Sequence, residues 1–366
     1  MALLWLGAAS VFVAVILLAV LTWGREEPTV PAMLQLSAQT VETGSEAQES
    51  RMVIPLGKAV GIKLFSDGVL VVGLSPVETE QGTCYPGRDS GLKTGDLITH
   101  IDGEEVDTIE EIQQAVALRA GESLAIQAVR GQQQLQLTVA PVENNQGVYQ
   151  LGVWLRDSMA GIGTMTFYDP DSQMFAALGH GINDVDTATL MPMESGSIMY
   201  ASVTDVKKGE SGAPGELHGS FDVNRDLGDL YANTNLGIYG VLRDGALSPH
   251  GEAVEVAARE EVHVGGATIL SNIAGEQVEE YQVEITHVYP AAAGDTRNLM
   301  VQVTDPRLLE TTGGIVQGMS GSPILQDGKL VGAVTHVLVN DPTRGYGILA
   351  ENMVSQCVWE EQAQVS

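Results

Sequence analysis

Hydrophobic and polar positions alternate along much of this chain, and the alternation predicts short β-strands joined by turns. It is clearest in residues 124–130 and 135–139, whereas 68–74 and 331–339 are nearly continuous apolar runs next to glycine. Residues 109–118 instead form an amphipathic stretch, which predicts a helix. The pattern predicts a mainly β chain that contains one α+β module.

A β-hairpin is predicted in the middle of the chain. Two apolar runs, 162–168 and 174–182, are separated by the turn sequence Asp169-Pro-Asp-Ser172. His180 closes the second run between two glycines, a placement that exposes an imidazole at a strand end. His180 is therefore a candidate general base, and an ordinary loop histidine is the alternative.

The N-terminus carries a different apolar pattern. Residues 2–23 contain no charged side chain, and a helix of that length spans about 33 Å, enough for one membrane crossing. We expect a transmembrane signal anchor over 1–24; a cleavable signal peptide is the alternative, but no clear cleavage site follows the run. The polar residues 25–53 are expected to form a juxtamembrane linker.

Composition narrows the possible partners. The 366 residues include 42 glycines and only 5% aromatics, which suits strands and turns, and the net charge is −29. Such a charge argues against nucleic-acid binding and against adhesion of the folded part to anionic lipid. Cys84 and Cys357 are expected to be unpaired thiols, and no histidine or carboxylate spacing suggests a metal site.

The segment Gly318-Met-Ser-Gly-Ser-Pro323 is the strongest candidate for chemistry. Its glycines permit a sharp turn that presents Ser320, and the amides of Gly318 and Ser320 would then converge on an oxyanion. A plain turn between two strands is the alternative, and Ser322 is a competing hydroxyl. Among the other histidines, His336 lies inside the apolar run 331–339, and a strand position explains it without a catalytic role.

Residues 90–106 carry a second set of signals. Ser90-Gly-Leu-Lys-Thr-Gly-Asp-Leu-Ile, followed by Ile101-Asp-Gly-Glu-Glu-Val, resembles the signature of bacterial PDZ domains. The resemblance implies a module over 54–142 that binds extended peptides by strand addition. By position, its carboxylate cradle is expected to contain Gly57, Val60, Gly61 and Ile62. A module kept only for packing and spacing is the alternative.

The combined segments resemble the stage IV sporulation protein B (SpoIVB) peptidases. Ala176-Ala-Leu-Gly-His-Gly-Ile-Asn-Asp, Lys208-Gly-Glu-Ser-Gly-Ala-Pro-Gly and the Ser320 segment carry this resemblance. It implies a trypsin-like double β-barrel peptidase domain over 143–366, with Ser320 as nucleophile, His180 as base and Asp305 orienting the imidazole. Other carboxylates remain open for the last role: Asp184, Asp186 and Asp341.

The resemblance also implies a function. We expect a membrane-tethered serine endopeptidase, without cofactor or metal, that cleaves a membrane-associated regulator of sigma-factor processing and also cleaves itself. Its ectodomain would face the space between forespore and mother cell. The alternative is a membrane-anchored PDZ adaptor whose peptidase fold is catalytically inert.

Overall fold

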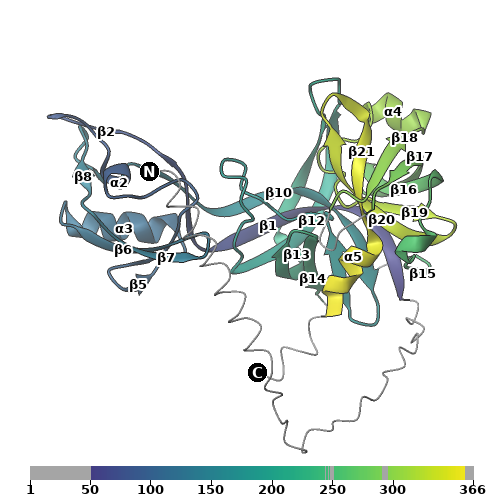
Figure 1. The fold of residues 1–366 in the computed structure, drawn as a ribbon, viewed down its shortest axis with the longest axis horizontal. Helices are drawn as coiled ribbons and strands as arrows, with labels where there is room; N and C mark the ends of the chain where they lie inside the picture. Colours follow the sequence, from purple (N-terminus) through teal and green to yellow (C-terminus); the bar gives the residue numbers. More distant parts are fainter. Residues whose placement is uncertain (1–50, 244, 246, 248–250, 291–295, 359–366) are drawn as a thin grey trace, which may run out of the picture. The chain divides into compact units, whose positions relative to one another are not determined.

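The computed structural model describes residues 51–243, 245, 247, 251–290 and 296–358, and these residues are mostly β-strand (Figure 1). The expected anchor over 1–24 and nearly all of the expected linker lie outside this range. Within the described residues, no helix is long and apolar enough to span a bilayer. The mainly β character predicted from the alternating pattern is confirmed.

Six antiparallel strands pair into a first closed ring. In spatial order they are β1 (Met52–Leu74), β10 (Val153–Asp169), β11 (Met174–Ala177), β14 (Gly237–Leu242), β13 (Glu216–Thr234) and β12 (Ser195–Lys207), and β12 pairs back with β1. Phe175, Ile198 and Ile238 are fully buried inside it. The hairpin predicted around Asp169 is the β10–β11 pair.

A second ring of six strands forms a closed barrel. Its members are β16 (Gly265–Ala274), β17 (Gln277–Val288), β18 (Leu299–Val303), β21 (Asp341–Leu349), β20 (Lys329–Leu338) and β19 (Pro323–Gln326). The core contains Ile269, Val301 and Val334. Short elements flank the barrels: β15 (Val254–Glu255), η1 (Arg259–Glu261), α4 (Pro306–Thr312), α5 (Ala350–Val354) and η2 (Ser355–Val358). Two closed rings fulfil the prediction of a double barrel and leave few exposed sheet edges.

The α+β module follows the first part of β1. It contains β2 (Val77–Thr79), β3 (Gly82–Cys84), α2 (Pro86–Asp89), β4 (Leu97–Ile101), β5 (Glu104–Glu105), α3 (Ile109–Arg119), β6 (Leu124–Arg130), β7 (Gln133–Val139), β8 (Val142–Glu143) and β9 (Tyr149–Gln150). The predicted helix is α3, which begins with a capping box formed by Thr108 and Glu111. Ile112 and Val116 of α3 are buried in the core of the module.

The start of the module differs from the predicted boundary at residue 54. Residues 54–65 pair with β10, and 60–65 also pair with β12, so this segment belongs to the first barrel. Val60 is buried in the core of that barrel. The boundary could not be located from the strand pattern alone, because one long strand, β1, contributes its first half to the barrel and its second half to the module. The module is therefore an insertion between two strands of the first barrel.

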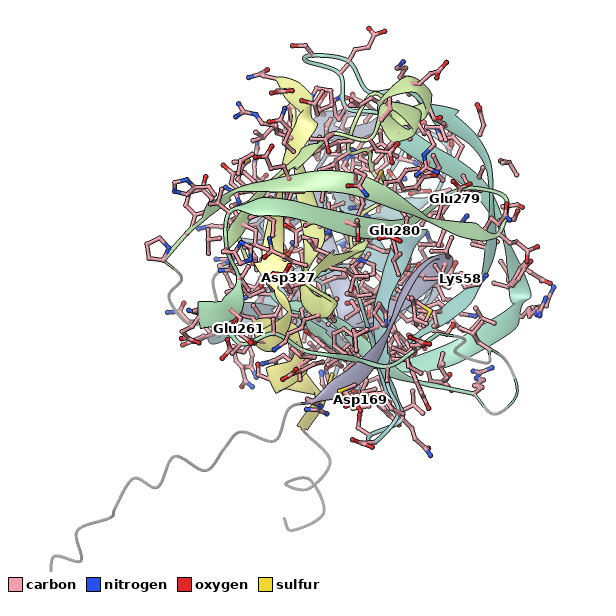
Figure 2. All side chains as sticks on the ribbon, turned by 90° about the vertical axis from the view of Figure 1, so that its right-hand side faces the viewer. Lys58, Asp169, Glu261, Glu279, Glu280 and Asp327 are labelled. Carbon is pink, nitrogen blue, oxygen red and sulfur yellow. The ribbon has the colours of Figure 1, made fainter. Side chains whose placement is uncertain are left out.

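Charged side chains lie mainly on the surface. Glu261, Glu279, Glu280 and Asp327 are exposed on the peptidase barrels (Figure 2). Cys84 and Cys357 are both unpaired, as expected. Cys357 is buried, and burial raises its thiol pKa to about 12, so this thiol does not serve as a nucleophile at neutral pH.

Candidate active site

Ser320 and His180 line one cavity of about 400 Å³. Ser320 stands in the turn that precedes β19 of the second barrel, and His180 follows β11 of the first barrel. The cavity wall is otherwise largely aliphatic: Ile62, Met159, Ile162, Leu178, Ile182, Ile315, Val316 and Val337. The lining contains no Asp, Glu, Lys or Arg side chain. The site thus pairs a hydroxyl and an imidazole with an apolar wall, which favours an apolar substrate side chain.

The turn around Ser320 has the backbone geometry expected of a nucleophile turn. Gly318 and Gly321 adopt φ values of +96° and +99°, a region in which other residues are strained. A β-carbon on Gly321 would lie 2.0 Å from the Thr164 carbonyl oxygen, so the close approach of β10 also requires glycine. Within the described part of the chain, the amides of Gly318 and Ser320 donate to no acceptor. Both predicted oxyanion donors are therefore available to a substrate.

Thr164 of β10 holds this turn in place. Its hydroxyl donates to the Gly318 carbonyl at 2.8 Å, and its amide donates to the Ser320 carbonyl at 3.1 Å. Its own carbonyl accepts the Leu178 amide, two residues before His180. The two bonded carbonyls belong to the Gly318–Met319 and Ser320–Gly321 peptide units, which flank the Ser320 amide, so these bonds restrict the backbone on both sides of that amide. Sequence reasoning missed Thr164, because an isolated threonine in a strand carries no local signal.

The hydroxyl of Ser320 donates to the Thr335 carbonyl at 2.7 Å. Attack on a substrate therefore requires this hydroxyl to turn from Thr335 toward His180, a change that is common between free and substrate-bound hydrolases. Ser322, the competing hydroxyl, is fully buried and donates to Ser271 of the barrel. Burial away from the cavity leaves Ser320 as the nucleophile candidate.

The imidazole of His180 is oriented by the backbone. Its Nδ1 lies 2.9 Å from the Gly181 carbonyl oxygen, which only accepts hydrogen bonds, so Nδ1 carries the proton and Nε2 is the basic nitrogen. Burial lowers the pKa of His180, and the Gly181 carbonyl opposes this shift in part. The ring is therefore mainly neutral at pH 7 and competent as a base. Asn233 secures the following segment through the Ile182 amide and carbonyl.

Asp305, the predicted orienting carboxylate, does not contact His180. It caps the N-terminus of α4, where its oxygens accept from the Arg307 backbone amide, the Arg307 guanidinium and the Gln282 amide. The Arg307 hydrogen bonds lower the Asp305 pKa to about 2. An Asp-Pro pair before a polar run is also a common helix start. In this structure Asp305 caps the helix and does not take the orienting role that its position in the sequence motif implied.

The other carboxylates considered for that role are also occupied elsewhere. Asp184 and Asp186 pair with Arg156, and Asp341 binds Thr343 and Arg344. No carboxylate within the described ranges hydrogen-bonds to His180. The nearest ring is instead that of His336, whose centroid lies 5.0 Å from that of His180. His336 also lines the cavity, so the sequence interpretation of it as an ordinary strand residue is incomplete.

The predicted peptide cradle of the α+β module lies elsewhere. Val60 and Ile62 are buried in the first barrel, and Gly57 and Gly61 belong to the same strand segment. A groove of about 880 Å³ in the module lies instead between α3 and residues 147–155. Its wall includes Leu151-Gly152-Val153, an apolar-glycine-apolar turn that follows the module's last long strand. In the described chain, the amides of Leu151 and Gly152 have no hydrogen-bond acceptor, as a carboxylate cradle requires.

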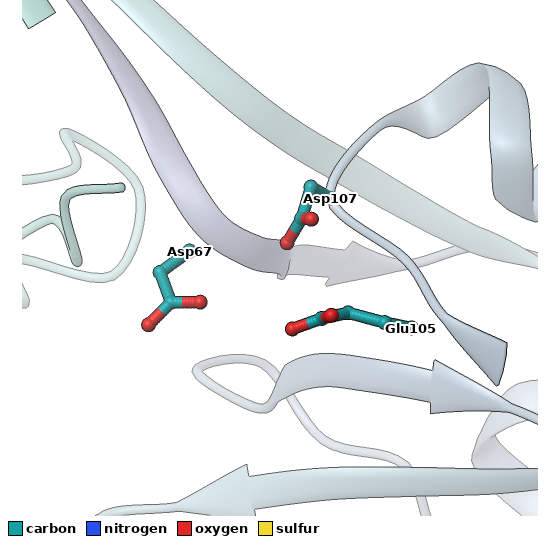
Figure 3. Close-up of side chains that lie close together, drawn as sticks. All are labelled: Asp67, Glu105 and Asp107. Carbon is teal, nitrogen blue, oxygen red and sulfur yellow. The ribbon is translucent and has the colours of Figure 1, made fainter. Parts of the chain in front are cut away.

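Three acidic side chains of the module gather near each other: Asp67, Glu105 and Asp107 (Figure 3). One ligand atom from each lies within 4.8 Å of the others. Asp67 and Glu105 are exposed, and Asp107 already accepts the Gly68 amide at 2.9 Å. Exposed carboxylates need no ion to coexist at this spacing in water, and we assign no metal here.

Thr164→Val should lower kcat for peptide hydrolysis roughly tenfold with little change in KM, because one hydrogen bond that positions the oxyanion donors is lost. Thr166→Val is the matched control. Thr166 is buried on the same strand, and its hydroxyl has no partner in the described region. Equal losses in the two variants, measured by steady-state kinetics, would contradict a positioning role for Thr164.

Asp305→Asn should lower kcat by less than about tenfold, because asparagine still caps α4, whereas loss of a triad aspartate costs about 10⁴-fold. The unfolding free energy should fall by about 2 kcal/mol at pH 7, since the charged bonds to Arg307 are weakened.

Denaturant titration provides the control for this variant. The Asp305 pKa is depressed from 3.8 to about 2, so its stabilising contribution is present above pH 3.8 and is lost as pH falls through about 2. The stability difference between the two proteins should close over that window. A kcat loss near 10⁴-fold would return Asp305 to the catalytic group.

Comparison with solved structures finds similar chains over parts of this protein. A solved PDZ domain of an SdrC-like protein from Listeria monocytogenes is 24% identical and covers 24% of this chain and 87% of its own, with a TM-score of 0.20. The Rv3671c protease of M. tuberculosis in its active form is 16% identical, covers 54% of this chain and 73% of its own, and has a TM-score of 0.31.

One curated relative is a protein named putative zinc metalloprotease CPE1693 from Clostridium perfringens, 32% identical over 68 residues. The match covers 19% of this chain and only about a fifth of that protein's length.

Family models match two regions. A PDZ domain model matches residues 83–130, and the SpoIVB peptidase S55 model matches residues 147–354, which include His180, Asp305 and Ser320. The second match covers more than half of the chain. The chain therefore belongs to the SpoIVB peptidase S55 family of serine peptidases and carries a PDZ domain.

Proposed function

We propose that this chain is a membrane-tethered serine endopeptidase that cleaves a regulatory membrane protein, and also itself, in sporulation signalling. One observation carries the catalytic part of the proposal. Ser320 and His180 meet in one cavity beside two backbone amides, Gly318 and Ser320, that have no acceptor among the described residues. This combination is what acyl transfer requires: a nucleophile, a base and an oxyanion site.

The reaction follows from these groups. Ser320 Oγ attacks the peptide carbonyl carbon, and His180 Nε2 takes its proton while Nδ1–H stays on the Gly181 carbonyl. The two amides stabilise the oxyanion, each by about 3 kcal/mol. His180 then protonates the leaving amine, which departs and leaves an acyl-enzyme. Water, deprotonated by His180, releases the acid and restores Ser320.

The cavity and surface suggest the substrate. An aliphatic wall without charged side chains favours an apolar residue next to the scissile bond. The net charge of −29 favours basic segments farther from the site, through long-range attraction that salt weakens. The membrane tether, the sporulation pathway, self-cleavage and a location facing the intermembrane space follow from family resemblance and the uncharged N-terminal run.

A PDZ adaptor with an inert peptidase fold is the second candidate. Two observations favour it: Ser320 donates to Thr335 rather than to His180, and His180 has no carboxylate partner in the described chain. The groove beside α3 would then be the functional site. The two candidates differ in whether Ser320 reacts.

Ser320→Ala should abolish both peptide cleavage and labelling by a fluorophosphonate probe, because the nucleophile is lost. Ser322→Ala is the control, and it should keep the labelling because Ser322 is buried away from the cavity. Labelling is followed by mass spectrometry of the modified peptide. If a folded wild-type sample is not labelled at Ser320, the adaptor is favoured.

Peptides with a free apolar C-terminus should bind the PDZ groove, and C-terminal amidation should weaken binding at least about tenfold by removing the charged hydrogen bonds of the cradle. Ala117→Arg should block the groove, because Ala117 is exposed and lines it. Gln114→Arg is the control, since Gln114 is equally exposed on α3 but lines no part of this groove.

Fluorescence anisotropy on the Ser320→Ala protein measures both effects without cleavage of the peptide. Equal binding by the free and the amidated peptide would contradict the assignment of Leu151-Gly152-Val153 as the cradle.

A further inference from the structure

One edge of β10 is open between the PDZ groove and the active site. β10 pairs with β1 along nearly its whole length, whereas β11 begins to pair with it only at Met165. On the side away from β1, residues 153–163 therefore have no partner strand within the described chain. We call this side the open edge. An unpaired strand edge presents a row of backbone donors and acceptors that a further extended chain can bind.

The direction of the backbone groups on this edge follows from Thr164. Its amide donates to the Ser320 carbonyl at 3.1 Å, and its carbonyl accepts the Leu178 amide at 3.1 Å, so both groups point away from β1. In an antiparallel strand the amide and carbonyl of one residue point to the same side, and that side alternates from residue to residue. Every second residue before Thr164 therefore points to the open edge.

The residues concerned are Ile162, Ala160 and Ser158. The pairing of β10 with β1 has no register shift over residues 158–165, so the alternation is not interrupted there. Among the described residues, no backbone group accepts from or donates to these three on the open edge. Their amides and carbonyls are thus available to an added strand next to the Ser320 turn.

Two cavities reach the open edge. Residues 159–162 of β10 line the catalytic cavity, and residues 153–155 line the groove beside α3. Only residues 156–158 lie between them, which is roughly 10 Å of extended strand. Arg156 there pairs with Asp184 and Asp186 through its side chain, which stands roughly perpendicular to the sheet and does not occupy the edge. A single extended peptide can therefore reach both cavities.

The two ends of the open edge also set the direction of a bound peptide. A carboxylate held by the free amides of Leu151 and Gly152 lies at the start of β10. The residues that precede this carboxylate in the peptide then extend along β10 toward Thr164, which holds the Ser320 turn. The peptide thus runs antiparallel to β10 and enters the active site from its C-terminal side.

We propose that the open edge binds the C-terminal tail of a protein substrate as an added antiparallel strand, which sets cleavage about ten residues before the substrate's C-terminus. The inference rests on the proposed peptidase activity and on the groove as the carboxylate site. The distance follows because one substrate residue lies opposite each residue from Val153 to Ile162. The substrate class is a protein with an extended tail, an apolar C-terminal residue and an apolar residue at the scissile bond.

The test uses unstructured peptides of about 30 residues, with leucine at every third position and a free C-terminal valine, and the full chain as enzyme. Mass spectrometry of the products maps the cuts. We expect them to cluster about 8 to 12 residues from the C-terminus, and a C-terminal extension of about four residues should move the cluster by the same number. C-terminal amidation should abolish the cluster, as should Ala117→Arg, whereas Gln114→Arg should keep it.

Two further peptides distinguish strand addition from simple tethering by the groove. Each is N-methylated on alternate backbone amides in the segment that would lie opposite residues 156–162, one on the odd and the other on the even positions. Only one of these sets faces β10, so one peptide should lose at least about tenfold in kcat/KM and the other should change little. Equal effects would overturn binding at the open edge.

Fluorophosphonate labelling separates this inference from the proposed function. If folded wild-type protein is not labelled at Ser320, the proposed function fails. If Ser320 is labelled but the cuts ignore the position of the C-terminus, only the role of the open edge is refuted. A labelled enzyme that cuts none of the peptides also counts against that role, because the series offers a leucine within the expected range.

Discussion

The active site depends on the contact of Thr164 with the Ser320 turn. Thr164 belongs to the first barrel, and Ser320 precedes a strand of the second. The threonine donates to the carbonyls of Gly318 and Ser320 and accepts from the amide of Leu178, so one residue joins the base segment to the nucleophile turn. The contact is close enough that Gly321 tolerates no side chain. The contact therefore fixes the nucleophile turn directly against the strand that pairs with the base segment.

The charged surface of the protein and its apolar cavity differ in how strongly water screens charge. Most acidic side chains of the described residues lie at the surface, where water and salt screen their charge. The cavity instead has an aliphatic wall and two imidazoles whose pKa values are lowered by burial. A base that is neutral at pH 7 in an apolar cavity suits proton transfer, but the imidazolium formed in the reaction then needs a local acceptor.

The PDZ domain and the first barrel share strands. β1 runs from the barrel into the module, and β10 runs from the groove segment toward Thr164. Val153 at the groove and Thr164 at the catalytic turn therefore lie on one strand, eleven residues apart. This arrangement explains why the predicted domain boundary and the predicted cradle were both displaced: the domains are interleaved in sequence rather than consecutive.

Local sequence patterns were enough to predict the strand-rich class, the helix at 109–118, the β10–β11 hairpin, and the Ser320 turn with its glycines. These depend on periodicity and on backbone freedom, which neighbouring residues encode. Which distant groups meet depends instead on the packing of the whole chain. Strand pairing between residues far apart in the chain brings Thr164, Thr335 and His336 close to Ser320 and His180. Asp305 instead caps the N-terminus of α4 and pairs with Arg307. Hydrogen bonds across barrels have no signature in a single sequence, because any threonine or histidine of a strand is locally equivalent until the register is set.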